Sequence, residues 1–226
     1  MLEYRQEVRP DLLNAMQFVK KASQLRGLCF GNKIDALLSG GLAQNTLTFL
    51  YGKHADMLMN ILCGNSIRVF GERTVFIDAA NSFDPYLIVE KCVPIKSEAS
   101  ARKFCERITV YRAFTCYQLR KLVSDKLVKE ISKAPVRSIF VTGIDSMFSE
   151  EDNTPEETET LQLLIAQDLA RLASGRQKND MFVVASSKER VKPLFQKCDT
   201  AIKLHAGEKA VLAKHYSRQF AESEIF

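Results

Sequence analysis

Residues Tyr51–Asn60, with the sequence YGKHADMLMN, join an apolar, β-prone run to the first turns of a predicted helix. The run is Leu47–Gly52 (LTFLYG), and the helical pattern continues over Leu58–Gly64 (LMNILCG). A strand, a glycine-containing loop and a helix in this order are the setting of a phosphate-binding loop. The segment therefore predicts the strand, turn and helix of such a unit.

The same stretch lacks the residues that bind phosphate. A phosphate-binding loop needs glycines so that its amides turn inward, a lysine for the β- and γ-phosphates, and a Ser or Thr hydroxyl for magnesium. Only Gly52 is in place, because Ala55 and Met57 occupy the later glycine positions. Leu58 and Met59 stand where the Lys–Thr pair would be. Three apolar side chains in this region predict a pocket filled by protein atoms, with no bound nucleotide, magnesium or other cofactor.

Three polar residues remain in the loop. Asp56 places a negative charge where an anion would bind. Lys53 is the one cation, and we expect it to pair with Asp56 or water rather than with an incoming anion. His54 and the two histidines near the C-terminus are too dispersed to form a metal site, so none is predicted.

Bulk properties are those of a single globular domain. The chain has 226 residues, 46% hydrophobic and 26% charged, which is long enough for a sizeable core. It has no apolar run of membrane-spanning length and no secretory segment, and its six cysteines form no metal-ligand spacing. We therefore expect a cytoplasmic protein without a membrane partner. The net charge of +5 permits contact with nucleic acid but does not require it.

Apolar runs and helical patterns alternate along the chain. After Leu47–Leu50, the predicted strands are Thr74–Ile77, Ile108–Tyr111, Ser138–Thr142, Phe182–Ala185 and Ala201–Leu204. The predicted helices are Asp11–Leu25, Tyr86–Lys91, Cys116–Ser132 and Pro155–Ala173, the last with a capping box of Thr154 and Glu157. This alternation predicts an α/β fold with a mostly parallel sheet flanked by helices on both faces. A C-terminal antiparallel hairpin is predicted around Ala206–Gly207–Glu208.

Four segments in the same order resemble the core ATPase domain of the RecA/RadA recombinases, over most of the chain. They are Gly31–Leu42 (GNKIDALLSGGL), Arg73–Pro85 (RTVFIDAANSFDP), Ile108–Leu119 (ITVYRAFTCYQL) and Val136–Phe148 (VRSIFVTGIDSMF). The pattern is most similar to the archaeal RadA paralogues, short single-domain relatives whose nucleotide sites vary. The resemblance implies one RecA-like domain over 1–226, with an N-terminal helical extension (1–27), a core (28–204), and a C-terminal hairpin and tail (205–226).

The resemblance also implies positions for the catalytic residues, and this sequence departs from the family there. The glutamate that orients the attacking water would fall at Ala80, and the Walker B aspartate at Thr142. Asp145, three residues later, could substitute only if the strand end were shifted. The phosphate cradle, the base and the metal support are thus lost together, which predicts that the chain does not hydrolyse ATP.

The family carries DNA on two loops that follow its central strands. The first corresponds to Ser149–Glu159, with six carboxylates and no cation, and would repel a phosphate backbone. It reads either as a solvated acidic loop leading to a helix N-terminus or as a surface for a basic partner. The second corresponds to Ser186–Leu194, a flexible segment in the prediction, in which Lys188, Arg190 and Lys192 are candidates for DNA contact. A solvated charged loop is the alternative there.

Together these observations predict a non-hydrolysing RadA-like paralogue that modulates homologous recombination by binding DNA, a recombinase or both. Single-stranded DNA is the preferred nucleic acid, and an oligomer is possible. Two alternatives remain open. The chain is either an ATP-binding protein with weak or displaced DNA-dependent hydrolysis, using Asp145, or an assembly and regulatory module that binds only proteins.

Overall fold

The computed structural model describes residues 27–31, 35, 38, 41–93, 97–148, 154–174, 181–205, 210–214 and 223–224. Its elements, in chain order, are β1 (Leu47–Gly52), α3 (Ala55–Phe70), β2 (Arg73–Asp78), α4 (Pro85–Cys92), α5 (Glu98–Cys105), β3 (Ile108–Arg112), α6 (Cys116–Lys121), the π-helical turn η1 (Leu122–Lys126), α7 (Leu127–Lys133), β4 (Val136–Thr142), α8 (Pro155–Ala173), β5 (Phe182–Ser187), α9 (Lys192–Lys197), β6 (Thr200–Leu204), β7 (Ala210–Lys214) and β8 (Ser223–Glu224).

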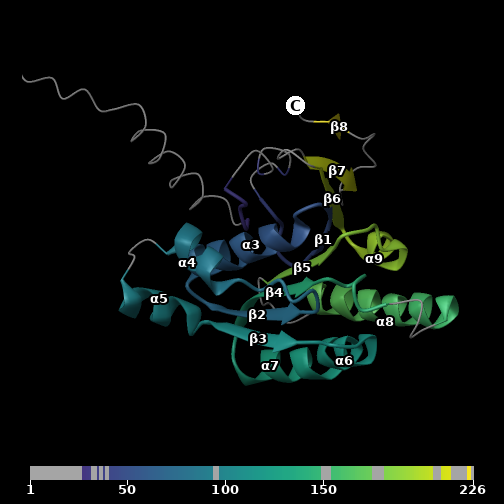
Figure 1. Ribbon diagram of the computed structural model, residues 1–226, viewed down its shortest axis with the longest axis horizontal. Coiled ribbons are helices and arrows are strands. Elements are labelled where there is room, and N and C mark those ends of the chain that lie inside the picture. The colour runs from purple at the N-terminus through teal and green to yellow at the C-terminus, as the bar shows by residue number, and fades with distance from the viewer. Residues whose placement is uncertain are drawn as a thin grey trace, which may run out of the picture.

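Six strands form an all-parallel sheet in the order β3-β2-β4-β5-β1-β6, flanked by helices on both faces (Figure 1). This confirms the predicted α/β class and all six predicted parallel strands. β1 is an inner strand, paired with β5 on one side and with β6 on the other. The loops that follow the strands therefore gather at one edge of the sheet, where α/β proteins bind ligands.

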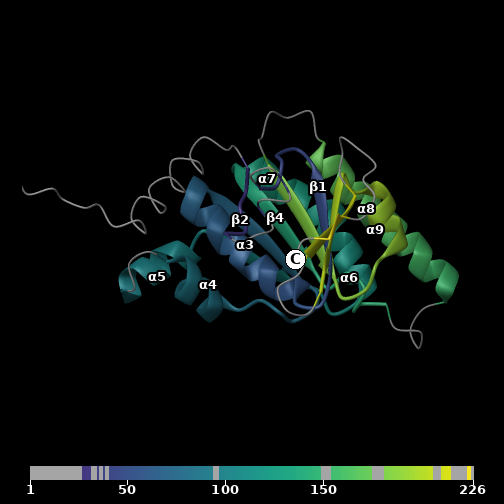
Figure 2. The same cartoon turned by 90° about the horizontal axis from the view of Figure 1, so that it is seen from above.

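Each face of the sheet packs against its own group of helices. On one face, alternate residues of the strands pack with α6, α7, α8 and α9 in a core that includes Phe49, Ile139 and Leu169. On the other face, Phe76 and Phe140 pack with α3 and α4. Because the strands are buried on both sides, their sequences are nearly continuous apolar runs. In both views α5 and α8 lie at opposite ends of the molecule (Figure 2).

Beyond β6, the chain adds two strands to the sheet. β7 runs antiparallel to β6, and β8 runs antiparallel to β7. The predicted turn at Ala206–Gly207–Glu208 lies outside the described residues, so the C-terminal hairpin stays a prediction. The predicted helix Asp11–Leu25 and the first part of the acidic loop, residues 149–153, also lie outside them.

Local sequence signals explain several element boundaries. The Thr154 hydroxyl accepts the Glu157 N–H at 3.2 Å, and the Glu157 carboxylate accepts the Thr154 N–H at 3.0 Å. This capping box, with Pro155 in the first turn, begins α8 where predicted. The helix predicted over Cys116–Ser132 is interrupted by the π turn η1 and forms as α6, η1 and α7.

Two helices were not predicted. α5 has only eight residues, none of them fully buried, and is shorter than the window of about 11 residues in which a helical period is recognised. α9 begins at Lys192, inside the segment Ser186–Leu194 that was predicted to be flexible, which is a correction. Its first turn contains Pro193, whose fixed φ suits that position. Across the part of the chain that the structure describes, no helix is both long and apolar enough to cross a membrane.

Candidate functional site

The turn between β1 and α3 lies where a phosphate-binding loop would lie, but only Lys53 and His54 separate the strand from the helix. The sequence predicted a longer turn within Tyr51–Asn60, with helical turns from Leu58. The structure corrects this, because α3 already begins at Ala55. A phosphate loop surrounds its anion with several successive amides, and a two-residue turn does not provide such a cradle.

Gly52 is required by the backbone at this turn. Its φ of 110° is a conformation that side chains rarely adopt, and a Cβ there would overlap the carbonyl oxygen of Leu204 at the end of β6. His54 has a φ of 67° and caps α3 without a side-chain hydrogen bond. The remaining glycine of the loop thus serves the close approach of β1 and β6.

The sequence predicted that the apolar residues of the loop fill one pocket. In the structure they differ in burial and do not lie in a common pocket. Met57 is 46% exposed, Leu58 is partly buried, and Met59 is fully buried in the core beneath α3. Ala55 is buried as well, whereas Lys53 is exposed. Polar side chains, rather than apolar bulk, connect the strand ends at this edge.

The first turn of α3 is joined to the end of β5 by Asp56. The Ser186 hydroxyl donates a 2.7 Å hydrogen bond to Asp56 Oδ1. Partial burial raises the pKa of the Asp56 carboxyl; the Ser186 hydrogen bond opposes this shift, and the nearby Asp145 charge adds to it. Because the N-terminus of a helix attracts negative charge, the Asp56 carboxylate takes the place that an external anion would occupy at α3.

Replacing Asp56 by asparagine is expected to leave the protein at least as stable at neutral pH. Because the pKa is raised, the folded state binds the Asp56 proton more tightly than the unfolded state does. The stabilisation that the protonated carboxyl gives the wild type is therefore lost as the pH rises from 3.8 through the folded pKa. The amide oxygen of Asn still accepts from Ser186. Urea unfolding of both proteins at about pH 7 and about pH 4 tests this. A clear loss of stability in Asp56→Asn at neutral pH contradicts it.

A second connection starts from Asp78, the last residue of β2, which is buried. Its carboxylate accepts the backbone N–H of Ser82 at 2.8 Å and that of Phe83 at 3.2 Å. It also accepts the Thr142 hydroxyl at 3.2 Å, and Arg112 Nε lies 3.7 Å from Oδ2. The carboxylate therefore holds the loop after β2 and the end of β4, rather than facing an open site.

The two positions implied for catalysis lie beside this connection. Thr142 ends β4, is fully buried, and is opposite Asp78 in the register of β2 and β4. Ala80 lies against Gly143, whose φ is 63° and where a Cβ would be 2.7 Å from the Ala80 nitrogen. The two loops thus meet at van der Waals distance where the family's glutamate would project.

Asn60 completes the links between α3 and the loop after β2. Its side-chain amide donates to the Ser82 carbonyl at 2.9 Å and to the Asp56 carbonyl at 3.1 Å. Its side-chain oxygen accepts the Asp84 N–H at 2.9 Å. Asn60 is buried, so these bonds are shielded from water and fix the loop to the helix.

Asp145 anchors the turn after β5. Its Oδ2 accepts the backbone N–H groups of Lys188 and Glu189, both at 2.9 Å. Its Oδ1 is buried and has no hydrogen-bond partner among the described residues. Asp145 therefore lies on the same edge of the sheet as Asp56, but its hydrogen bonds are to backbone N–H groups.

The three basic residues proposed for DNA contact lie in the turn after β5 and at the start of α9. Lys188 is exposed. The Arg190 guanidinium lies 3.9 Å from the centre of the Phe195 ring, and Lys192 Nζ lies 3.7 Å from Glu159 Oε1. Two of the three cations thus already have partners within the chain.

The acidic residues of the Ser149–Glu159 segment that the structure describes lie in the first turns of α8, where they favour the helix dipole. This supports a local structural role for Glu156, Glu157 and Glu159. No group of three or more His, Cys, Asp or Glu side chains within metal-binding distance occurs in the described part of the chain, and His215 lies outside it.

Sequence reasoning missed Asp78, Asn60 and Ser186. Asp78 carried a signal, since an acid directly after an apolar strand often lies at the ligand edge of an α/β sheet. The hydrogen bond between Asp56 and Ser186 joins residues 130 apart in the chain, and no local pattern predicts such a contact.

The chain matches no model of a known protein family, and no curated protein matches it either.

Proposed function

We propose that this chain is a non-hydrolysing RecA/RadA-like protein that modulates homologous recombination by binding single-stranded DNA, a recombinase or both. In this proposal the RecA-like core keeps its sheet and C-terminal hairpin. The former nucleotide site serves as a structural junction between the loops, and the protein acts through its surfaces.

The observation that carries the proposal is the β1–α3 turn. It has two residues, and the N-terminus of α3 carries the Asp56 carboxylate, bound to Ser186. A nucleotide phosphate entering there would meet negative charge and would have to displace this hydrogen bond.

The surrounding edge supports the same view. Asp78 accepts hydrogen bonds from the loop backbone and from Thr142, and Asn60 bonds to the backbone of the same loop. Ala80 offers no carboxylate to orient a water molecule, as the attack on a γ-phosphate requires. A chain with this edge on a recombinase-like sheet suits a partner protein better than an enzyme.

A strand-exchange reaction catalysed by a RadA recombinase tests the proposal. Adding the full chain in amounts comparable to the recombinase is expected to change the rate of exchange, in either direction, and the chain is expected to bind the recombinase or a labelled single strand. An unchanged rate, together with no binding to either, contradicts the proposal.

The same assays separate the alternatives. ATP hydrolysis by the chain alone, stimulated by DNA and lost in Asp145→Ala, would replace the proposal by a displaced ATPase. Recombinase binding without any affinity for DNA would restrict it to a protein-binding assembly module.

A further inference from the structure

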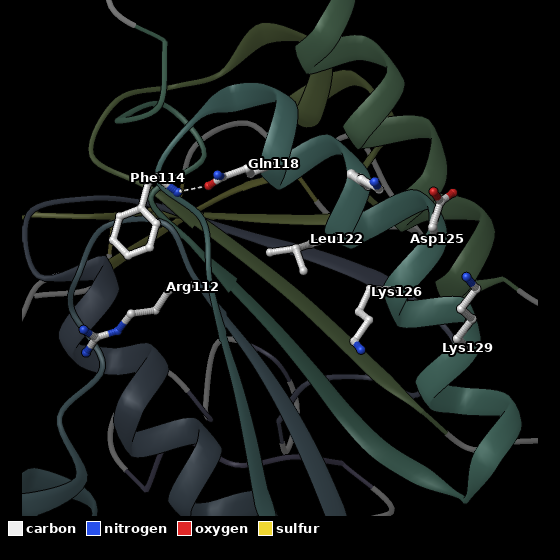
Figure 3. A pocket seen from close by; sticks show the side chains of 8 residues that line it. Arg112, Phe114, Gln118, Leu122, Asp125, Lys126 and Lys129 are labelled. Carbon is white, nitrogen blue, oxygen red and sulfur yellow. Dashed lines mark hydrogen bonds between the residues drawn. The ribbon is translucent and has the colours of Figure 1, made fainter.

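A pocket of about 390 Å³ lies at the opposite side of the sheet from β6, between the edge strand β3 and the helix formed by α6, η1 and α7 (Figure 3). β3 pairs with β2 and begins the strand order, so the pocket follows the outer border of the sheet. Leu122, in the π turn, points into the space between strand and helix. The groove is thus built from two secondary-structure elements rather than from loops.

Positive charge dominates the lining of this groove. Arg112, Lys121, Lys126 and Lys129 line it, against the single carboxylate of Asp125. Arg112 also forms an ion pair with Asp78, at 3.7 Å, but half of its side chain is exposed. Within the described residues, the three lysines have no carboxylate at ion-pair distance. An occupant of this groove is therefore expected to be an anion.

An exposed aromatic ring, that of Phe114, lies beside these cations. Phe114 lines the groove and is 73% exposed. The Phe114 N–H donates to Gln118 Oε1 at 2.9 Å, which fixes the start of α6 beneath the ring. Lys126 Nζ lies 5.2 Å from the centre of the Tyr111 ring. An exposed ring next to lysines that have no carboxylate partner suits a ligand that has both phosphates and planar bases.

The helix that forms one wall contains η1, a π turn over Leu122–Lys126 in which the Leu127 N–H bonds the Leu122 carbonyl. Such turns are rare and occur often at functional sites, because they alter which side chains face a neighbouring element. Leu122 and Lys126 of this turn both line the groove.

We propose that the groove between β3 and the α6–η1–α7 helix is a binding site for single-stranded nucleic acid. The lysines contact the phosphate backbone, and Phe114 stacks on an unpaired base. A duplex hides the faces of its bases, whereas a single strand exposes them to the ring. An acidic peptide would pair with the lysines, but its carboxylates would not stack on the exposed Phe114 ring. This inference rests on the proposed DNA-binding function and moves its site away from residues 186–194.

The test uses the full chain and a fluorescein-labelled oligothymidylate, with anisotropy measured over a salt series. The triple variant Lys121→Gln, Lys126→Gln, Lys129→Gln is expected to weaken binding and to reduce the slope of log affinity against log salt by about 2, since each single-strand phosphate contact contributes about 0.7. The matched control replaces Lys188, Arg190 and Lys192 by alanine and is expected to keep the wild-type slope.

Phe114 gives a second test that does not alter charge. Phe114→Ala is expected to weaken binding roughly tenfold without changing the salt slope, because a stacking contact is lost. Phe114→Tyr keeps the ring and is expected to bind like the wild type. Since the ring is exposed, both variants should retain the wild-type unfolding curve.

Each other outcome overturns the inference in a distinguishable way. If oligothymidylate binds and only the control triple weakens it, the DNA function stands and the site lies in the turn after β5. If the chain binds polyglutamate through the three lysines but no oligonucleotide, the groove belongs to an acidic polypeptide. If the wild type binds no single strand even at low salt, the DNA-binding part of the proposed function fails as well.

Discussion

Gly52→Ala is expected to destabilise the protein by about 3 kcal/mol, the sum of a strained φ and a forced displacement of packed backbone. The φ of Gly52 is 110°, and a methyl group would overlap the Leu204 carbonyl on the neighbouring strand. The substitution therefore pushes β1 from β6 in the middle of the sheet. Urea unfolding followed by circular dichroism measures the loss.

Gly71→Ala is the matched control. Gly71 ends α3 with a φ of 70°, but the nearest atom to an added Cβ is Arg107 Nη1, at the end of a flexible side chain, 3.3 Å away. Only the backbone strain remains, so a loss of about 1 kcal/mol is expected. Equal losses at the two glycines would contradict the structural role of Gly52 at the β1–β6 contact.

Asp78→Ala is expected to cost about 3–5 kcal/mol, because it leaves one buried donor and two partly buried donors without their acceptor. The Ser82 and Phe83 N–H groups and the Thr142 hydroxyl all donate to this carboxylate. Asp78→Asn retains an acceptor oxygen, so a smaller loss is expected. Denaturant unfolding of both variants gives the comparison.

Asp84, in the same loop, provides the control for removing a carboxylate. It caps α4 by accepting the Leu87 N–H at 3.0 Å and is exposed, so Asp84→Ala is expected to lose about 1 kcal/mol. If Asp78→Ala unfolds like the wild type, its carboxylate does not hold the loops together, and a ligand-binding role for Asp78 becomes the better explanation.

The sheet could be predicted from sequence because its strands are buried on both faces. Runs such as Thr74–Ile77 and Phe182–Ala185 are apolar throughout, which separates them from the amphipathic helices between them. α8 was predicted to the residue, since its capping box and proline mark the first turn chemically. By contrast, α5 has eight residues and α9 has six, so both are shorter than the window of about 11 residues in which a helical period is recognised.

Only the residue types of the candidate site could be predicted from the sequence; its turn length and its hydrogen bonds could not. The sequence predicts a phosphate loop without phosphate ligands around Gly52, Leu58 and Met59, because the motif is defined by residue type and spacing. It does not give the length of the turn, which depends on how α3 packs beneath the sheet. Nor does it give the hydrogen bonds of Asp56 and Asp78, since these join residues brought together by strand register.

The groove beside β3 was missed for a related reason. Arg112 and Phe114 follow a strand, and Lys121, Lys126 and Lys129 lie on a helix, where cations usually form a solvated face. Only the placement of that helix along the sheet edge collects them around one pocket. The loop at 186–194 drew attention instead because its three cations are close in sequence.

Isothermal calorimetry of the full chain with Mg-ATP tests the central claim most directly, with an ATP-binding recombinase measured in parallel to validate the nucleotide. The two-residue β1–α3 turn and the Asp56–Ser186 hydrogen bond predict no saturable heat for this chain. Micromolar affinity that disappears in Asp145→Ala, whose Oδ1 is buried without a protein partner among the described residues, would contradict the account.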